Sequence, residues 1–112
     1  MNKLIPERLK NAREARSLTK AAVSRLCGLS KIGYCRYEYG DRSPSPQMID
    51  ILSQRLGTSV AYLTGETEDM RADQIVVSKD GNPALFELTE QCMGADEKTL
   101  KRLLAYYHKI KE

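Results

Sequence analysis

The chain has 112 residues, of which 41% are hydrophobic and 29% charged, and its formal net charge is +3 at pH 7. This length fits one ordinary domain with an appendage rather than two full domains. No apolar run approaches the ~20 residues of a membrane-spanning helix. The first ten residues, MNKLIPERLK, are too polar for a signal peptide, so we expect a cytoplasmic protein without a membrane segment.

The cysteines and the single histidine do not form a metal-binding pattern. Cys27, Cys35 and Cys92 lack the Cys-x-x-Cys spacing of a zinc site, and His108 is the only histidine. We therefore expect free thiols, with no metal and no cofactor. The sequence also has no Ser/His/Asp set, no glycine loop that would cradle a phosphate and no paired carboxylates, so we do not expect an enzyme.

Charge is distributed unevenly along the chain. Residues 1–65 contain 11 Lys and Arg against 5 Asp and Glu, whereas residues 66–112 contain 7 against 10. A basic first half suits a polyanionic partner, and an acidic second half suits protein contacts or simple solubility.

The first two helices are predicted by a proline, a capping residue and apolar spacing. Pro6 suits the first turn of a helix over about 6–16. Thr19 is a plausible N-cap for a second helix over about 19–27. The residues expected on the buried sides of these helices are Leu9, Ala12, Ala15, Val23 and Cys27.

A tight turn and a third helix follow directly. Gly28 suits a turn in which φ is positive. Ser30 can cap a helix that runs to about Tyr39 and buries Tyr34 and Tyr37, and Gly40 ends it. Two short helices joined in this way have the layout of a helix-turn-helix, whose second helix is shaped to enter the DNA major groove.

The rest of the chain is predicted to hold two further helices, a linker and a helical hairpin. The fourth helix covers about 46–56, and Ser59 caps a short fifth helix that includes Tyr62 and Leu63. We expect a DNA-binding domain at 1–65, a linker at 66–82 in which QIVVSKDGN allows a short strand, and a C-terminal segment at 83–112. The C-terminal segment is predicted to form helices at 84–93 and 96–111, with Asp96 as the N-cap of the second.

Residues 7–65 resemble the Cro and phage-repressor-like family of helix-turn-helix regulators, often called Xre-like. The order and spacing of several short elements carry the resemblance: Arg8-Leu9-Lys10, Arg13, Leu18-Thr19, Gly28-Leu29-Ser30, Arg36-Tyr37-Glu38, Gly40, Pro44 and Ala61-Tyr62-Leu63-Thr64-Gly65. The resemblance implies an all-α fold, a five-helix lambda-repressor-like domain followed by the linker and the hairpin.

The resemblance also implies which residues contact double-stranded DNA. Base contacts carry over to the start of the third helix and one turn further on, at Lys31, Ile32, Cys35 and Arg36. Phosphate contacts are expected at Thr19, Lys20, Ser30, Arg42 and Ser43. The same residues allow alternative roles. Arg36 can be a solvated surface charge, Lys31 can bind a phosphate instead of a base, and Cys35 can make no specific contact.

One structural pair and one departure also follow from the resemblance. Arg13 and Glu38 should form a largely buried ion pair between the first and third helices. A glutamine that is usual at the start of the second helix is replaced here by Lys20, so the usual bracing of the third helix by that glutamine is in doubt.

The tail carries the prediction about partners. Its final helix has an apolar face at Leu100, Leu103, Leu104 and Tyr107, where we expect a homodimer contact or a small protein antagonist or toxin. The leading hypothesis is a homodimeric, sequence-specific repressor at a palindromic operator of a phage, mobile element or bacterial operon. The alternative is an antitoxin or adaptor whose hairpin binds another protein and whose DNA binding serves autoregulation.

Overall fold

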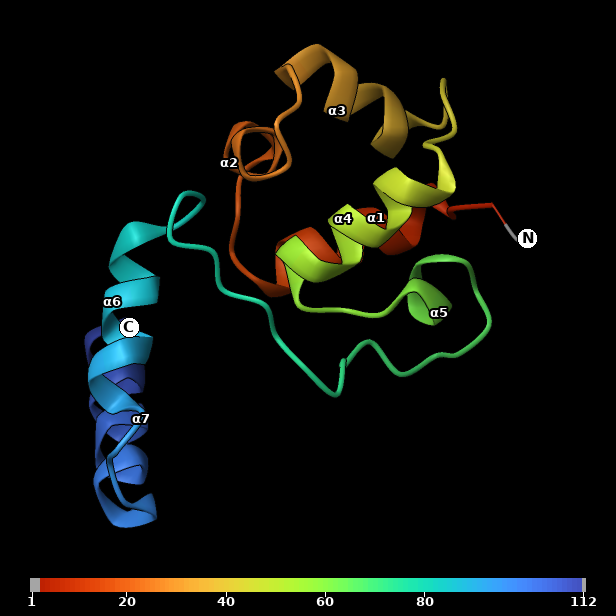
Figure 1. The fold of residues 1–112 in the computed structure, drawn as a ribbon. Coiled ribbons are helices and arrows are strands. Elements are labelled where there is room, and N and C mark those ends of the chain that lie inside the picture. The colour runs from red at the N-terminus through yellow and green to blue at the C-terminus, as the bar shows by residue number, and fades with distance from the viewer. Residues whose placement is uncertain (1–2, 112) are drawn as a thin grey trace. The chain divides into compact units, whose positions relative to one another are not determined.

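The computed structural model describes residues 3–111, and this part of the chain contains seven helices and no strand. The all-α class predicted from the sequence is therefore confirmed. The chain divides into two compact units, with the division between Val77 and Ser78 (Figure 1). The division falls inside the segment 66–82 that the sequence marks as a linker.

Five helices make up the first unit, and their ends lie within about one residue of the predicted ones. They are α1 (Pro6–Ala15), α2 (Lys20–Leu26), α3 (Lys31–Tyr39), α4 (Pro46–Leu56) and α5 (Val60–Leu63). Four of them begin at a hydroxyl side chain that accepts a backbone N–H three residues on: Thr19, Ser30, Ser45 and Ser59. Gly40 and Gly57 end α3 and α4 with φ of 80° and 63°.

The core of the first unit lies where these helices meet. α3 packs against α1 and α2, α4 packs against α2 and α5, and α5 packs against α1. The most deeply buried large side chains are Leu9, Val23, Tyr34, Leu52, Leu56 and Leu63. Tyr37 packs against this core but is only partly buried, and Ala15 is exposed, so the prediction that Ala15 lies on the buried side of α1 is wrong.

The segment that follows Gly65 packs against the five helices of the first unit as far as Met70. The Thr58 hydroxyl donates to the Met70 carbonyl at 2.5 Å, and the Met70 side chain packs against the core. The Arg8 guanidinium donates to the Tyr62 carbonyl at 3.2 Å and also to the Thr67 carbonyl. Residues up to Met70 are thus held to the domain by long-range contacts.

The short strand that the sequence allows at QIVVSKDGN is not formed. Ile75 and Val76 are exposed, and no other strand lies within residues 3–111 to pair with them. Because a strand gains its hydrogen bonds only from a neighbouring strand, an apolar run of β-branched residues without a neighbour stays irregular.

The second unit contains α6 (Pro83–Cys92) and α7 (Glu97–Lys111), and the chain turns back between them (Figure 1). Asn82 and Asp96 accept the backbone N–H groups of Leu85 and Thr99 at 3.1 and 2.8 Å. The hydrogen bonds from Thr99 lower the pKa of the Asp96 carboxyl. Neither helix contains a buried residue. None of the helices within residues 3–111 is long and apolar enough to cross a membrane.

Candidate nucleic-acid interface

The turn between α2 and α3 brings the two helices close together. Leu29 donates its backbone N–H to the Ser24 carbonyl at 2.8 Å, and Gly28 takes a φ of 69°. Ser24 is only 3% exposed, and its hydroxyl donates to the Ala21 carbonyl at 2.7 Å. A small residue that satisfies its own hydroxyl therefore occupies the buried side of α2.

The outward face of α3 carries four side chains in one row. Ile32, Cys35, Arg36 and Tyr39 follow the i, i+3, i+4, i+7 spacing that places residues on one side of a helix. Ile32 and Tyr39 are 68% and 64% exposed, and Arg36 and Lys31 are also exposed. The opposite face holds the fully buried Tyr34. α3 thus presents an aliphatic group, two cations and a phenol to solvent while its other side is fixed in the core.

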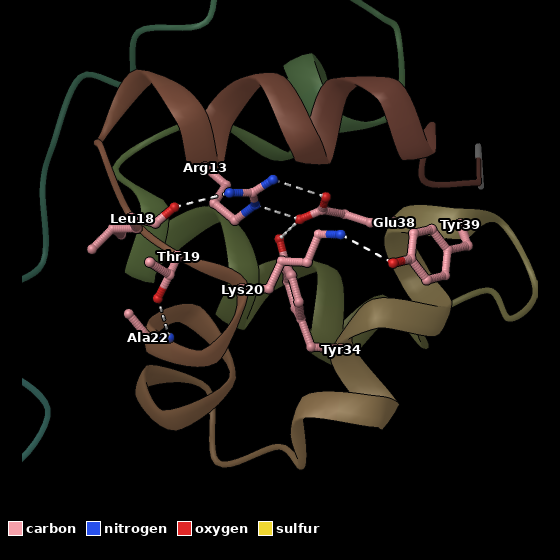
Figure 2. A network of polar contacts seen from close by, with 8 residues as sticks. All are labelled: Arg13, Leu18, Thr19, Lys20, Ala22, Tyr34, Glu38 and Tyr39. Atoms are coloured by element: carbon pink, nitrogen blue, oxygen red, sulfur yellow. Dashed lines mark hydrogen bonds and ion pairs between the residues drawn. The ribbon is translucent and has the colours of Figure 1, made fainter.

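An ion pair ties α3 to α1 (Figure 2). The Arg13 guanidinium donates from Nε to Glu38 Oε2 at 2.6 Å and from Nη2 to Glu38 Oε1 at 3.2 Å. A third donor, Nη1, reaches the Leu18 carbonyl at 2.9 Å. The side chains of Arg13 and Glu38 are only 12% and 2% exposed. The pair therefore connects α1, the residue before the N-cap of α2, and the end of α3.

Tyr34 completes this network from within α3. Its hydroxyl donates to Glu38 Oε2 at 2.5 Å, so the carboxylate has a partner on both sides (Figure 2). The hydrogen bond to Glu38 raises the pKa of Arg13. Burial, followed by the hydrogen bond to Glu38, raises the pKa of the Tyr34 phenol. The network therefore favours a charged arginine beside a neutral phenol.

We expect the domain to lose stability steeply in alkaline solution. The pKa of Tyr34 is higher in the folded protein than its ordinary value of 10.0, so its stabilisation is complete below pH ~10 and is lost as the pH rises further. Burial raises the pKa of Cys27 from 9.0 to about 11, which adds a loss of the same sign above pH ~9. Each group contributes at most about 1.4 kcal/mol per pH unit.

Urea denaturation between pH 8 and 11.5 measures this loss. Tyr34→Phe and Cys27→Ala lower the starting stability, but each should also flatten the dependence of the free energy of unfolding on pH. Parallel curves for the wild type and Tyr34→Phe above pH 10 would contradict the assignment to Tyr34.

The predicted phosphate contacts surround α3. Thr19 and Ser30 accept the capping bonds from Ala22 and Gly33 at 3.1 and 3.0 Å, which leaves their hydroxyl protons free to donate. Arg42 and Ser43 are exposed in the loop after α3. These side chains lie at the start of α2 and at both ends of α3.

Lys20 is not a free surface charge. Its ammonium donates to the Tyr39 hydroxyl at 3.1 Å and lies 4.7 Å from the centre of the Tyr39 ring (Figure 2). The hydrogen bond with Tyr39 raises the pKa of Lys20. This contact joins the beginning of α2 to the end of α3, at the position where the family resemblance implies a glutamine instead.

Sequence reasoning missed Tyr39 and Arg16. Tyr39 had a signal, because it lies seven residues after Ile32 and so on the same face of a helix. Arg16 had no local signal. It donates to the Leu56 and Gly57 carbonyls at 2.9 and 2.8 Å and so satisfies the C-terminal end of α4, 40 residues further along the chain.

The predicted dimerisation residues all lie on one exposed face of α7. Leu100 and Leu103 are each 40% exposed, Leu104 is 56% and Tyr107 is 53% exposed. On α6, Leu85 and Leu88 are exposed, whereas Phe86 and Cys92 are half-buried. Large apolar side chains are rarely left in water as a continuous face, so this face suits a partner.

The hairpin is not acidic, although the second half of the chain is. The excess of acidic residues lies in 66–82, where 5 Asp and Glu face 2 Lys and Arg, whereas 83–112 contain 5 of each sign. On α7 the basic side chains Lys98, Lys101, Arg102 and Lys109 lie opposite the apolar face. The feature of the hairpin that suits a partner is therefore its apolar face and not a net negative charge. Within residues 3–111, no three His, Cys, Asp or Glu side chains are grouped so that they could hold a metal ion.

Comparisons with known proteins place the first unit in a family and show a similar fold. The helix-turn-helix family profile matches residues 9–63. Antitoxin PezA of Streptococcus pneumoniae is 33% identical over 63 residues, which are 56% of this chain and 40% of that protein. The match thus spans less than half of that relative. A transcriptional regulator from Listeria innocua superposes with a TM-score of 0.51 over 99% of this chain and 95% of that one. At 14% identity the superposition shows a shared fold.

Proposed function

Residues 9–63 belong to the helix-turn-helix family of DNA-binding transcriptional regulators, and we propose that this chain is a sequence-specific, homodimeric repressor. It binds a palindromic operator in double-stranded DNA, in the cytoplasm of a bacterium, with a bacterial operon, mobile element or phage as the regulated unit. The observation that carries the proposal is the exposed row on α3, held in place from behind by the Arg13–Glu38 pair.

Each outward side chain at the start and middle of α3 suits a base edge in the major groove. The Arg36 guanidinium matches the two acceptors of guanine, O6 and N7, and Ile32 suits the methyl group of thymine. Lys31 lies at the first turn, where it serves a guanine or a phosphate. Cys35 lies on the same face of α3 as Ile32 and Arg36, and in this proposal it lines the contact with the bases.

Phosphate contacts fix the register of the domain on the duplex. Thr19, Lys20, Ser30, Arg42 and Ser43 supply hydroxyl and cationic donors around α3. A single domain of this size binds weakly, and a dimer gains affinity by reaching two half-sites one helical turn apart. The apolar face of α7 is the dimer contact in this proposal.

Selection of binding sites from random DNA tests the proposal, and Arg36→Ala sharpens the test. We expect an enriched palindrome, with Arg36→Ala relaxing the preference at one base pair of each half-site by about 1–3 kcal/mol. The matched control is Arg42→Ala, which removes an arginine from the loop after α3 and should weaken all sequences alike. A selection that enriches no sequence would overturn sequence-specific repression.

A second candidate function is that of an antitoxin or adaptor, favoured by the relative named antitoxin and by the exposed apolar face of α7. In that case the hairpin binds a toxin or a small antagonist, and DNA binding serves autoregulation. Co-purification with the product of a neighbouring gene would support this function. A stable homodimer that retains no other protein during purification from its host would contradict it.

A further inference from the structure

We propose that Lys20 and Tyr39 together form one binding site for a phosphate group of the DNA backbone, in which Tyr39 is a direct contact. The inference rests on the proposed DNA binding and extends it to a residue of α3 that no motif of the sequence marks. The two side chains come from different helices and are already joined at 3.1 Å in the free protein (Figure 2).

The position of Tyr39 along α3 places it near the backbone of the duplex. Tyr39 is on the same face as Ile32 and seven residues further on, which corresponds to roughly 10 Å along the helix axis. The major groove is about 12 Å wide. When the start of α3 faces the bases, the other end of the same face therefore reaches the sugar-phosphate edge of the groove.

The donors of the two side chains suit a phosphate. The Lys20 ammonium has three N–H donors, of which Tyr39 accepts one, so two remain for phosphate oxygens. The Tyr39 oxygen accepts from Lys20, so its own O–H proton is free to donate to the same phosphate. Tyr39 is 64% exposed, and a ligand can reach it without displacing the core.

The site is also held ready and keeps its charge. The ammonium lies 4.7 Å from the ring centre, a cation–π arrangement that restrains a long, flexible side chain before the ligand arrives. The hydrogen bond with Tyr39 raises the pKa of Lys20, so the ammonium stays charged. The Glu38 carboxylate, whose charge also raises the pKa of Lys20, is 2% exposed and bonded to Arg13 and Tyr34, so it is not free to pair with the Lys20 ammonium.

Binding titrations with Tyr39→Phe, Lys20→Met and the double variant test the proposal. Each is measured over a series of salt concentrations on the selected operator and on a random-sequence duplex of equal length. Tyr39→Phe removes only the hydroxyl and should weaken binding about tenfold on both duplexes without changing the salt dependence. Lys20→Met should weaken both and lower the slope of log K against log salt by about 1 for each bound subunit. Tyr106→Phe, which alters an exposed tyrosine of α7, is the matched control and should bind like the wild type.

The double variant tells a shared phosphate from two separate contacts. Because both donors serve one phosphate, the double variant should lose clearly less than the product of the two single losses. Wild-type affinity for Tyr39→Phe, a multiplicative double variant, or a loss confined to the selected operator would each overturn the proposal. If selection enriches no sequence but Tyr39→Phe still weakens duplex binding, sequence-specific repression fails and the phosphate site stands. A wild-type protein that binds no duplex would overturn both.

Discussion

Replacement of Arg13 by methionine is expected to lower the free energy of unfolding by about 3–5 kcal/mol, because it leaves the Glu38 carboxylate buried without its cation. The Glu38 side chain is 2% exposed and accepts two bonds from Arg13, so water cannot take the place of the guanidinium without opening the contact between α1 and α3. Chemical denaturation followed by circular dichroism measures the change.

Two further variants separate the buried charge from a general effect of substitution. Arg71→Met removes an arginine whose pair with Asp69 is 3.9 Å long and fully accessible, at 91% and 66% exposure, so it should cost less than about 1 kcal/mol. In the double variant Arg13→Met/Glu38→Gln, a neutral amide oxygen still accepts from Tyr34, and much of the lost stability should return. A single-variant loss as small as that of Arg71→Met would show that the pair contributes little.

The local parts of the fold could be predicted from the sequence because they depend on neighbouring residues. Thr19, Ser30 and Ser59 each accept a backbone N–H three residues away, and Gly40 and Gly57 take positive φ where a helix ends. Such contacts are encoded within one turn of chain, so a capping serine or a glycine locates a helix end to within a residue.

The long-range contacts could not be predicted because their partners are far apart in the sequence. Arg16 reaches the end of α4 across 40 residues, and Arg8 reaches Thr67 across 59. Arg13 and Glu38 were paired in advance only through the family resemblance. Lys20 and Tyr39 can each be found in the sequence, but no local pattern predicts that the Lys20 ammonium donates to the Tyr39 hydroxyl. Conversely, the β-branched run at Ile75 and Val76 predicts a strand, but residues 3–111 contain no strand with which it could pair.

These differences bear on the interface as well as on the fold. The outward face of α3 follows from spacing alone, since every third or fourth residue lies on the same side of a helix. How firmly that face is held follows only from the structure, where Glu38 and Tyr39, adjacent in sequence, anchor α3 to α1 and to α2. The end of α3 therefore contacts two other helices, which favours a rigid outward face.

Two substitutions on α7, Leu103→Glu and Leu104→Glu, are expected to turn the proposed dimer into a monomer. Both side chains lie in the exposed apolar face of the helix, at 40% and 56% exposure, and a carboxylate there must be buried without a partner if the dimer forms. Glutamate is a good helix former, so α7 itself should persist. Affinity for a two-half-site operator should fall by about 10²- to 10⁴-fold, because the second half-site is no longer reached intramolecularly.

Sedimentation equilibrium and titration of DNA with one and two half-sites measure both effects on the same protein. Binding to a single half-site should be unchanged, since α1 to α5 form a separate compact unit. The matched control is Lys98→Glu/Arg102→Glu, which places the same two charges on the opposite, basic side of α7 and should remain dimeric. A variant of the apolar face that stays dimeric and keeps full operator affinity would move the dimer contact out of α7. A wild-type protein that is already monomeric would leave this face to a different protein and favour the antitoxin or adaptor function.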